Sequence, residues 1–130
     1  MIERYTRPKM KAIWELKRKY EIWLAVELAA CAAFERAGQV PRGTAARIAK
    51  KATIDVKRIA RIEQVTKHDV IAFLESLVDS VGPEHRFLHM GLTSSDIVDT
   101  SLAVQMTEAL DLILDDLEEL IAVLKRQALK

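Results

Sequence analysis

The feature that most limits how this chain can fold is a long apolar pattern in its last third. Large apolar residues recur three or four positions apart, without an intervening glycine or proline, at Leu102, Met106, Leu110, Ile113, Leu117, Leu120 and Leu124. This spacing predicts one helix of about 37 residues from Ser94 to Lys130, roughly 55 Å long. A compact domain of this chain length is only about 35 Å across. The helix must therefore overhang its own domain, and its apolar stripe needs partner helices.

The preceding sequence predicts an arm and a second helix. The first ten residues, which include Pro8, predict an extended arm. A helix follows and ends near Ala37, because Gly38 and Pro41 favour termination there. Its apolar face carries Ile13, Leu16, Tyr20, Leu24, Leu28 and Cys31.

Three shorter helices are predicted between Gly43 and Gly82. They are the stretches "TAARIAKKA", "DVKRIARIEQV" and "DVIAFLESLVDSV". Thr44, Asp55 and Asp69 stand at their starts, where a side-chain oxygen accepts hydrogen bonds from the first backbone N–H groups. Gly82 closes the third helix, and a loop leads to Leu92. The fold class is therefore all-α. Because Lys130 lies in mid-pattern, we expect the amino-terminal part of a longer, oligomeric protein.

Composition argues against several classes of partner. Twenty Lys and Arg balance nineteen Asp and Glu, for a net charge of +1, so nucleic acid is not an expected partner. The single cysteine, Cys31, has no disulfide mate, which favours a reducing cytoplasm. No segment has the apolar length of a membrane span. His85 and His89 lie four residues apart in a predicted loop without a completing carboxylate, so we expect no metal site.

The stretch "GLTSSDIVD" allows two interpretations. Thr93, Ser94 and Ser95 offer hydroxyls beside the free N–H groups of the long helix, and such a helix start suits a carboxylate or phosphate. The alternative is a capping box, with Thr93 or Ser94 as the cap and Asp96 reaching back.

Two further polar groups are candidates for ligand binding. "TKHDV" places Lys67, His68 and Asp69 at a junction between two helices, as a donor, a titratable ring and an acceptor. The alternative there is a cap at Asp69 beside two solvated residues. In "ERYTRP", Arg4 and Arg7 on either side of Tyr5 could clamp a phosphate, or could belong to a solvated terminus.

Three stretches in order carry a family resemblance: "MIERYTRPKM", "EQVTKHDVIAFL" and "HMGLTSSDIVDTSLAVQM". With their spacing, essentially the whole chain resembles the amino-terminal region of the adenylosuccinate lyase family, within the fumarase and aspartase superfamily. The resemblance implies a helical amino-terminal domain over residues 1–92. Residues 93–130 would begin the first long helix of a central bundle that forms a homotetramer core.

The resemblance also implies a reaction and roles. The family eliminates fumarate from adenylosuccinate, giving AMP, and from the succinylated imidazole carboxamide ribotide of purine synthesis, without a cofactor. By resemblance, Thr93 and Ser94 hold the succinyl carboxylate, and Arg4 and Tyr5 hold the nucleotide end. Lys67, His68 and Asp69 contact polar groups of the substrate, and His89 helps to position it.

The family's general-acid histidine and general-base serine lie beyond Lys130, and its active sites are assembled from three subunits. We therefore expect this chain alone to be inactive. It departs from the family pattern at Lys9, where an acidic residue is usual, and in "IWELKRKY", which lacks the usual polar helix-start residue after the tryptophan. Both departures concern the first helix.

Two alternatives remain. Within the superfamily, argininosuccinate lyase or fumarase is the runner-up, although "RYTRP" and "TKHD" favour the purine enzyme. In a different class, the chain would be a helical interaction module whose apolar stripe binds a partner groove.

Overall fold

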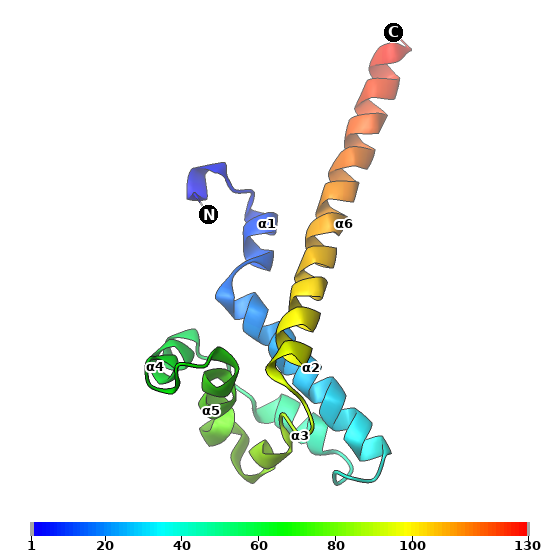
Figure 1. Cartoon of the computed structure of the whole chain (residues 1–130). Helices are drawn as coiled ribbons and strands as arrows, with labels where there is room; N and C mark the ends of the chain where they lie inside the picture. The colour runs from blue at the N-terminus through cyan, green and yellow to red at the C-terminus, as the bar shows by residue number, and fades with distance from the viewer. Residues whose placement is uncertain (1, 130) are drawn as a thin grey trace.

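The computed structural model describes residues 2–129 and contains only helices within them, which confirms the all-α prediction. Figure 1 shows a cluster of shorter helices from which one long helix projects. In chain order the elements are η1 (Glu3–Tyr5), α1 (Pro8–Ile13), α2 (Leu16–Arg36), α3 (Thr44–Lys51), α4 (Val56–Thr66), α5 (Asp69–Val81), η2 (Gly82–Phe87) and α6 (Ser94–Ala128).

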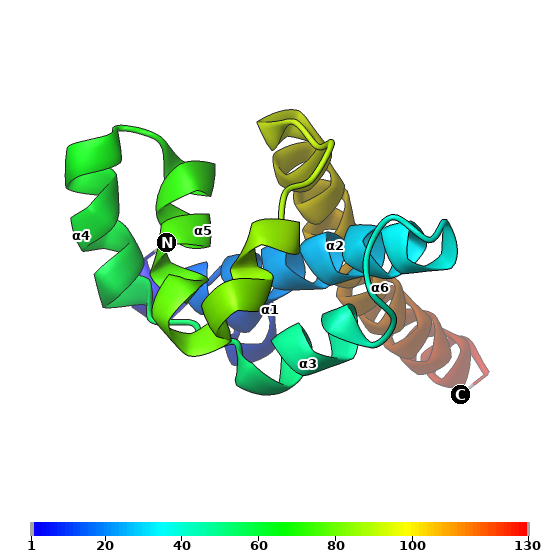
Figure 2. The same cartoon turned by 90° about the horizontal axis from the view of Figure 1, so that it is seen from below.

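The core lies where α2 meets α5. Tyr20 and Trp23 of α2 pack against Phe73 of α5, with Trp23 edge-on to both other rings at centroid distances of 5.3 and 5.5 Å. Edge-to-face contacts between buried rings add to the stabilisation from apolar burial. The pair α4 and α5 lies to one side of α2, as Figure 2 shows from below. The aromatic cluster therefore fixes α5 against α2 and sets where the start of α5 lies.

Helix α6 packs on its own domain through a polar and small-residue face. Its buried residues are Ile97, Ser101, Gln105 and Ala109. The indole N–H of Trp23 donates to Ser101 Oγ at 2.8 Å, and Gln105 Nε2 donates to the carbonyl of Ile13 at 2.6 Å. These bonds pair polar groups that would otherwise be buried without partners, at a cost in stability. They hold the first part of α6 against α2 and α1.

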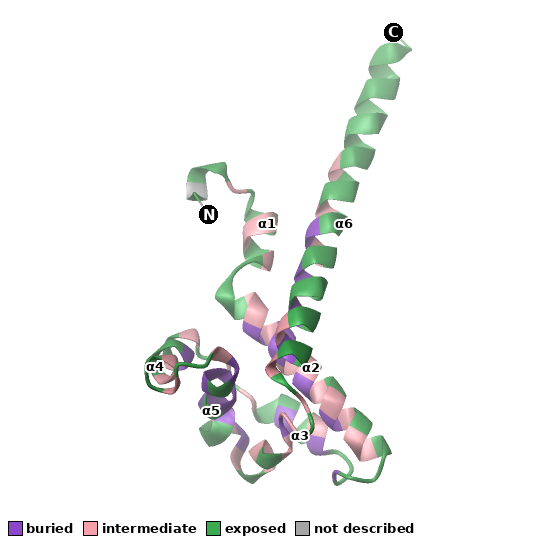
Figure 3. Cartoon of the chain, viewed as in Figure 1, coloured by how far each residue is buried: buried purple, intermediate pink, exposed green. Residues whose placement is uncertain are grey.

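The rest of α6 projects from the domain, and its apolar stripe is exposed (Figure 3). At 35 residues the helix is about 52 Å long, as expected from its pattern. The seven stripe residues from Leu102 to Leu124 are each 46 to 58% exposed. The stripe is thus a different face from the one that packs on the domain. The predicted end at Lys130 lies outside the described residues.

The predicted arm and second helix are only partly right. Pro8 begins α1, in keeping with the preference of proline for the first helical turn. The chain then turns at Trp14 and Glu15, and α2 starts at Leu16, so Ile13 and Leu16 do not share one helix face. Glu15 is extended, with φ −73° and ψ 146°. Gln105 satisfies a carbonyl at the end of α1, so a tertiary contact stabilises a break that no glycine or proline marks.

One of the three predicted caps is confirmed and two are wrong. The Asp55 prediction is confirmed, because its carboxylate accepts from the N–H groups of Lys57 and Arg58. The prediction that Thr44 caps α3 is wrong, because its hydroxyl donates to the carbonyl of Pro41 instead. The prediction that Asp69 caps α5 is also wrong, since Asp69 is already the first helical residue and His68 occupies the cap position.

A glutamate of α2 replaces the missing Thr44 cap. Glu35 accepts hydrogen bonds from the N–H groups of Gly43 and Ala45, at 2.8 and 2.6 Å. These backbone bonds, that from Ala45 first, lower the pKa of the Glu35 carboxyl. The start of α3 is therefore set by a contact to α2.

The segment after α5 is more ordered than the predicted loop. Gly82 ends α5 with φ 73°, a backbone conformation that favours glycine, and η2 occupies the first part of the segment. Glu84 of η2 pairs with Arg47 and Lys51 of α3. No helix within residues 2–129 is long and apolar enough to cross a membrane.

Candidate functional site

Two helix starts that are distant in sequence meet at one place. His68 is the cap of α5, and Ser94 is the first residue of α6. His68 Nε2 lies 3.4 Å from Ser94 Oγ. Unpaired N–H groups and the helix dipole make each helix start favourable for negative charge. The fold therefore brings two of the predicted site residues together beside two such starts.

The hydrogen bonds of His68 indicate which ring nitrogen carries the proton. The N–H of Ile71 donates to His68 Nδ1 at 3.4 Å, so Nδ1 is the acceptor. In the neutral ring the proton then resides on Nε2, which can donate to Ser94 Oγ. The side chain of His68 is exposed, so a ligand at Ser94 could also reach it.

Asp69 and Lys67 flank His68 with different local roles. Asp69 Oδ1 accepts from the N–H of Val70 at 2.8 Å, and its Oδ2 lies 3.9 Å from Nζ of Lys19. Lys67 ends α4 in the left-handed region at φ 53°, which makes the sharp turn between α4 and α5. Its side chain is exposed. This turn brings all three predicted residues to one end of the α4 and α5 pair.

Thr93 and Ser94 have separable local roles. Thr93 is the cap of α6, and Asp96 completes a capping box by accepting the N–H of Thr93 at 2.8 Å. The capping interpretation is therefore confirmed for Thr93. Ser94 stands one residue inside the helix, and its hydroxyl contacts His68. The hydroxyl of Ser94 is thus not needed to cap α6.

His89 is hydrogen-bonded to a buried glutamate of α2. A carboxylate of Glu27 accepts from the backbone N–H of His89 at 2.7 Å, and its other oxygen lies 2.7 Å from the ring Nδ1. Glu27 is 1% exposed. His89 lies four residues before Thr93, so the segment that leads into α6 is anchored to α2.

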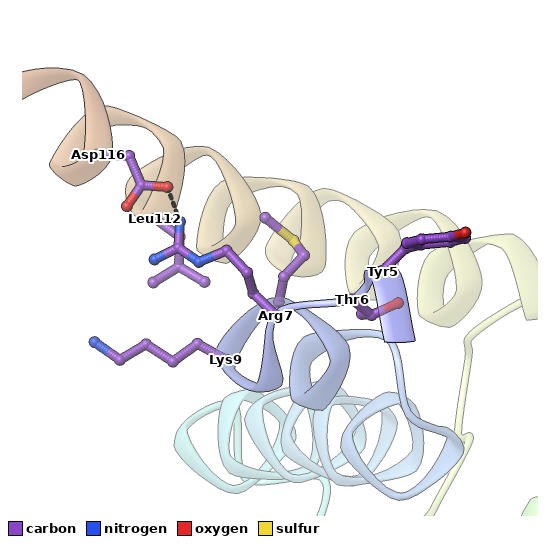
Figure 4. Close-up of a pocket in the computed structure, with 7 residues that line it drawn as sticks. Tyr5, Thr6, Arg7, Lys9, Leu112 and Asp116 are labelled. Carbon is purple, nitrogen blue, oxygen red and sulfur yellow. Dashed lines mark hydrogen bonds and ion pairs between the residues drawn. The ribbon is translucent and has the colours of Figure 1, made fainter. Parts of the chain in front are cut away.

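The structure does not bring Arg4 and Tyr5 to this cluster. Tyr5 lines a pocket whose far wall is formed by Leu112 and Asp116 of α6. Leu112 lies about 18 residues beyond Ser94, or about 27 Å along the helix. Figure 4 shows Arg7 paired with Asp116, while Tyr5 points away from that pair. Arg4 lies over the Tyr5 ring, 4.8 Å from its centroid.

Burial keeps two titratable side chains of α2 in their neutral forms. Burial raises the pKa of the Tyr20 hydroxyl, and Glu63 and Asp69 add to the shift, so Tyr20 stays neutral. Burial likewise raises the pKa of the Cys31 thiol, which leaves it a poor nucleophile. Within residues 2–129, no three acidic, histidine or cysteine side chains form a group that could hold a metal ion.

Sequence reasoning missed two charged residues of α2. Lys19 joins the site through Asp69 and lies over the Trp23 ring at 4.4 Å. Glu27 lies four residues after the buried Trp23 and four before the buried Cys31 on the same helix. A charged residue on a buried face is unusual unless it is paired, and that was the available signal for Glu27.

Comparison with known proteins gives consistent results. Residues 3–130 match the Lyase family. Adenylosuccinate lyases of Aquifex aeolicus, Bacillus subtilis and Synechocystis are 45%, 41% and 47% identical over 98% of this chain. The chain spans about 30% of the length of each of these relatives.

Two solved structures share the fold. A 3-carboxy-cis,cis-muconate lactonizing enzyme from Pseudomonas putida superposes with a TM-score of 0.85 and 32% identity, over 97% of this chain and 30% of that one. A fumarate lyase from Mesorhizobium superposes with a TM-score of 0.73 and 26% identity, over 81% of this chain and 26% of that one.

Proposed function

Since this chain belongs to the Lyase family, we propose that it corresponds to the amino-terminal part of an adenylosuccinate lyase. The complete protein would eliminate fumarate from adenylosuccinate to give AMP, and would cleave the succinylated imidazole carboxamide ribotide in the same way. Such an elimination is a carbon–nitrogen bond cleavage. It requires a base beside a carboxylate, an acid for the departing nitrogen and fixed donors for the developing negative charge.

The observation that carries this proposal is the contact between His68 and Ser94. It joins two polar segments, "TKHD" and "LTSSD", at two helix starts that favour anions. Thr93 and Ser94 would hold the succinyl carboxylate, as the free donors of α6 suit that charge. Lys67, His68 and Asp69 would contact polar groups of the substrate.

The other substrate contacts would come from elsewhere. Arg4 and Tyr5 would bind the nucleotide phosphate, because a guanidinium matches phosphate oxygens. Tyr5 lines a pocket with Leu112, which lies about 27 Å along α6 from Ser94, and this separation favours a pocket built from more than one copy of the chain. His68 and His89 would have supporting roles, with the principal acid and base supplied by other parts of the protein.

The exposed stripe of α6 supports an assembled protein. We propose that residues 93–130 begin a bundle helix of a homotetramer and that residues 1–92 form the helical domain beside it. A helix that leaves seven large apolar residues half exposed gains stability by packing against other helices. We place the protein in the cytoplasm, where its buried cysteine would stay reduced.

Steady-state turnover tests the proposal. The protein encoded by the complete gene is expected to release fumarate and AMP in equal amounts from adenylosuccinate. The 130-residue chain alone is expected to release neither, because it lacks the acid and base. Absence of turnover by the complete protein would refute the proposed activity. Turnover by the chain alone would refute the proposal that the acid and base come from other parts of the protein.

One alternative has an observation in its favour. The same exposed stripe fits a helical interaction module, in which α6 binds a groove on another protein. Substrate protection separates the two proposals. Adenylosuccinate or AMP is expected to slow proteolysis of the complete lyase, whereas an interaction module would not respond to either.

A further inference from the structure

Glu27 is a buried carboxylate in the middle of α2. It is 1% exposed, and its neighbours on the buried face of the helix are Trp23 and Cys31. Its two oxygens face one residue, His89, with both distances at 2.7 Å. Within residues 2–129, every buried side-chain nitrogen and oxygen has a hydrogen-bond partner. The burial of Glu27 is therefore compensated by His89.

Burying a charged carboxylate is costly unless it is paired and hydrogen-bonded. An apolar residue of similar size would avoid that cost at this position. A fully buried glutamate whose hydrogen bonds, among residues 2–129, all go to His89 thus calls for an explanation beyond core packing. We look for that explanation in His89, because histidine side chains often carry protons and bind ligands.

The contact controls three properties of His89. It holds the backbone at φ 58°, a left-handed conformation that is strained for a residue other than glycine. It makes Nδ1 the proton-bearing nitrogen, since a carboxylate oxygen only accepts. It therefore leaves Nε2 as the nitrogen available to a ligand, on a side chain that is 20% exposed.

The same contact also places the start of α6. Leu92 donates its N–H to the carbonyl of His89 at 3.4 Å, which closes a turn before Thr93. Within that turn Gly91 has φ 69°, and a Cβ there would lie 3.3 Å from Phe34 of α2. The turn is thus fastened to α2 at His89 and fitted closely against it at Gly91.

We propose that Glu27 is a positioning residue, which acts through His89 to direct Nε2 toward an anionic group of the bound substrate. The Glu27 carboxylate holds the proton at Nδ1, so that Nε2 faces the ligand, and a ring that carries a proton on both nitrogens donates its Nε2–H to a carboxylate or phosphate oxygen. This inference rests on the proposed function for the identity of the substrate. The arrangement of Glu27 and His89 does not depend on it.

Glu27→Gln is the variant that tests the inference, because it keeps size and removes charge. A glutamine in this position can donate to Nδ1, which would move the ring proton to Nε2 and remove the carboxylate that stabilises a ring protonated on both nitrogens. In the complete protein we expect kcat/KM for adenylosuccinate to fall about tenfold to about a hundredfold, mainly through KM. Glu27→Asp keeps the charge and is expected to recover part of that loss.

Glu35→Gln is the matched control. Glu35 lies on the same helix and also accepts two hydrogen bonds, but from backbone N–H groups at the start of α3. It is expected to lower the melting temperature while kcat/KM stays within about twofold of the wild type. A general effect of losing a glutamate from α2 would instead appear in both variants.

The ring proton provides a readout that does not depend on catalysis. In the 130-residue chain, nitrogen-15 NMR of the histidine rings is expected to show the proton of His89 on Nδ1, and Glu27→Gln to change this. An unchanged His89 ring, or kcat/KM changes equal to those of Glu35→Gln, would overturn the inference. An inactive wild-type complete protein would refute the proposed function and the substrate assigned here. The NMR result would still decide whether Glu27 sets the state of His89.

Discussion

Replacing Ser94 with alanine separates ligand binding from helix capping. The cap of α6 is Thr93, and Ser94 lies one residue inside the helix. Among residues 2–129, its hydroxyl makes one hydrogen-bond contact outside α6, at 3.4 Å to His68 on an exposed surface. Alanine also has a higher helix propensity than serine. We therefore expect Ser94→Ala to change the free energy of unfolding by no more than about 0.5 kcal/mol.

The expected loss of activity is much larger. A hydrogen bond to a charged group contributes about 1.5 to 3 kcal/mol, and each 1.36 kcal/mol is about tenfold in rate. If Ser94 binds the succinyl carboxylate, kcat/KM of the complete protein falls about tenfold to about 150-fold. The assay is fumarate release, with urea unfolding measured on the same samples. Ser95→Ala, at the exposed next position, is the control. Equal kinetics for the two variants would refute the role of Ser94.

Three further predictions concern the fold. Ser101→Ala leaves the buried indole N–H of Trp23 without its acceptor, so urea unfolding followed by tryptophan fluorescence is expected to show a loss of about 1 to 3 kcal/mol. The pKa of Glu35 is below its ordinary value of 4.5, so its contribution to stability is present above that pH and lost on acidification through the lowered pKa. The melting temperature of Glu35→Gln is therefore expected to fall less than that of the wild type between neutral and acid pH, and an identical decline would contradict this. Leu117→Glu, on the exposed stripe, is expected to reduce self-association in light scattering without changing the melting temperature, whereas a strictly monomeric wild-type chain would argue against association through the stripe.

Local signals in the sequence predicted the elements that depend on local structure. Asp55 caps α4 as its sequence pattern indicates, and α6 begins at Ser94 because Thr93 and Asp96 form a capping box within four residues. The exposed stripe from Leu102 to Leu124 was also visible as a period in the sequence. These features need only residues close to one another along the chain.

Contacts between distant segments decided the features that sequence reasoning missed. The break after Ile13 depends on Gln105, which is far along the chain in α6. Thr44 lost its capping role to Glu35 of another helix. Asp69 is not the cap of α5 for a local reason: His68 occupies the cap position one residue earlier, and its ring nitrogen accepts the N–H of Ile71.

In the candidate site, too, the sequence predicted the residue types, whereas contacts between distant segments decided which residues meet. Residue types and the family resemblance selected Lys67, His68, Thr93 and Ser94, and the fold places His68 against Ser94. The role of Glu27 required its partner, because a glutamate on a helix gives no sign of which distant residue will cover it. Pairing of this kind is a property of tertiary packing.

The most direct measurement is a crystal structure of the complete protein with AMP and fumarate bound. We expect a fumarate carboxylate within hydrogen-bond distance of Ser94 Oγ and the first N–H groups of α6, with His68 beside it. Fumarate bound elsewhere, with Ser94 still contacting only His68, would contradict this expectation.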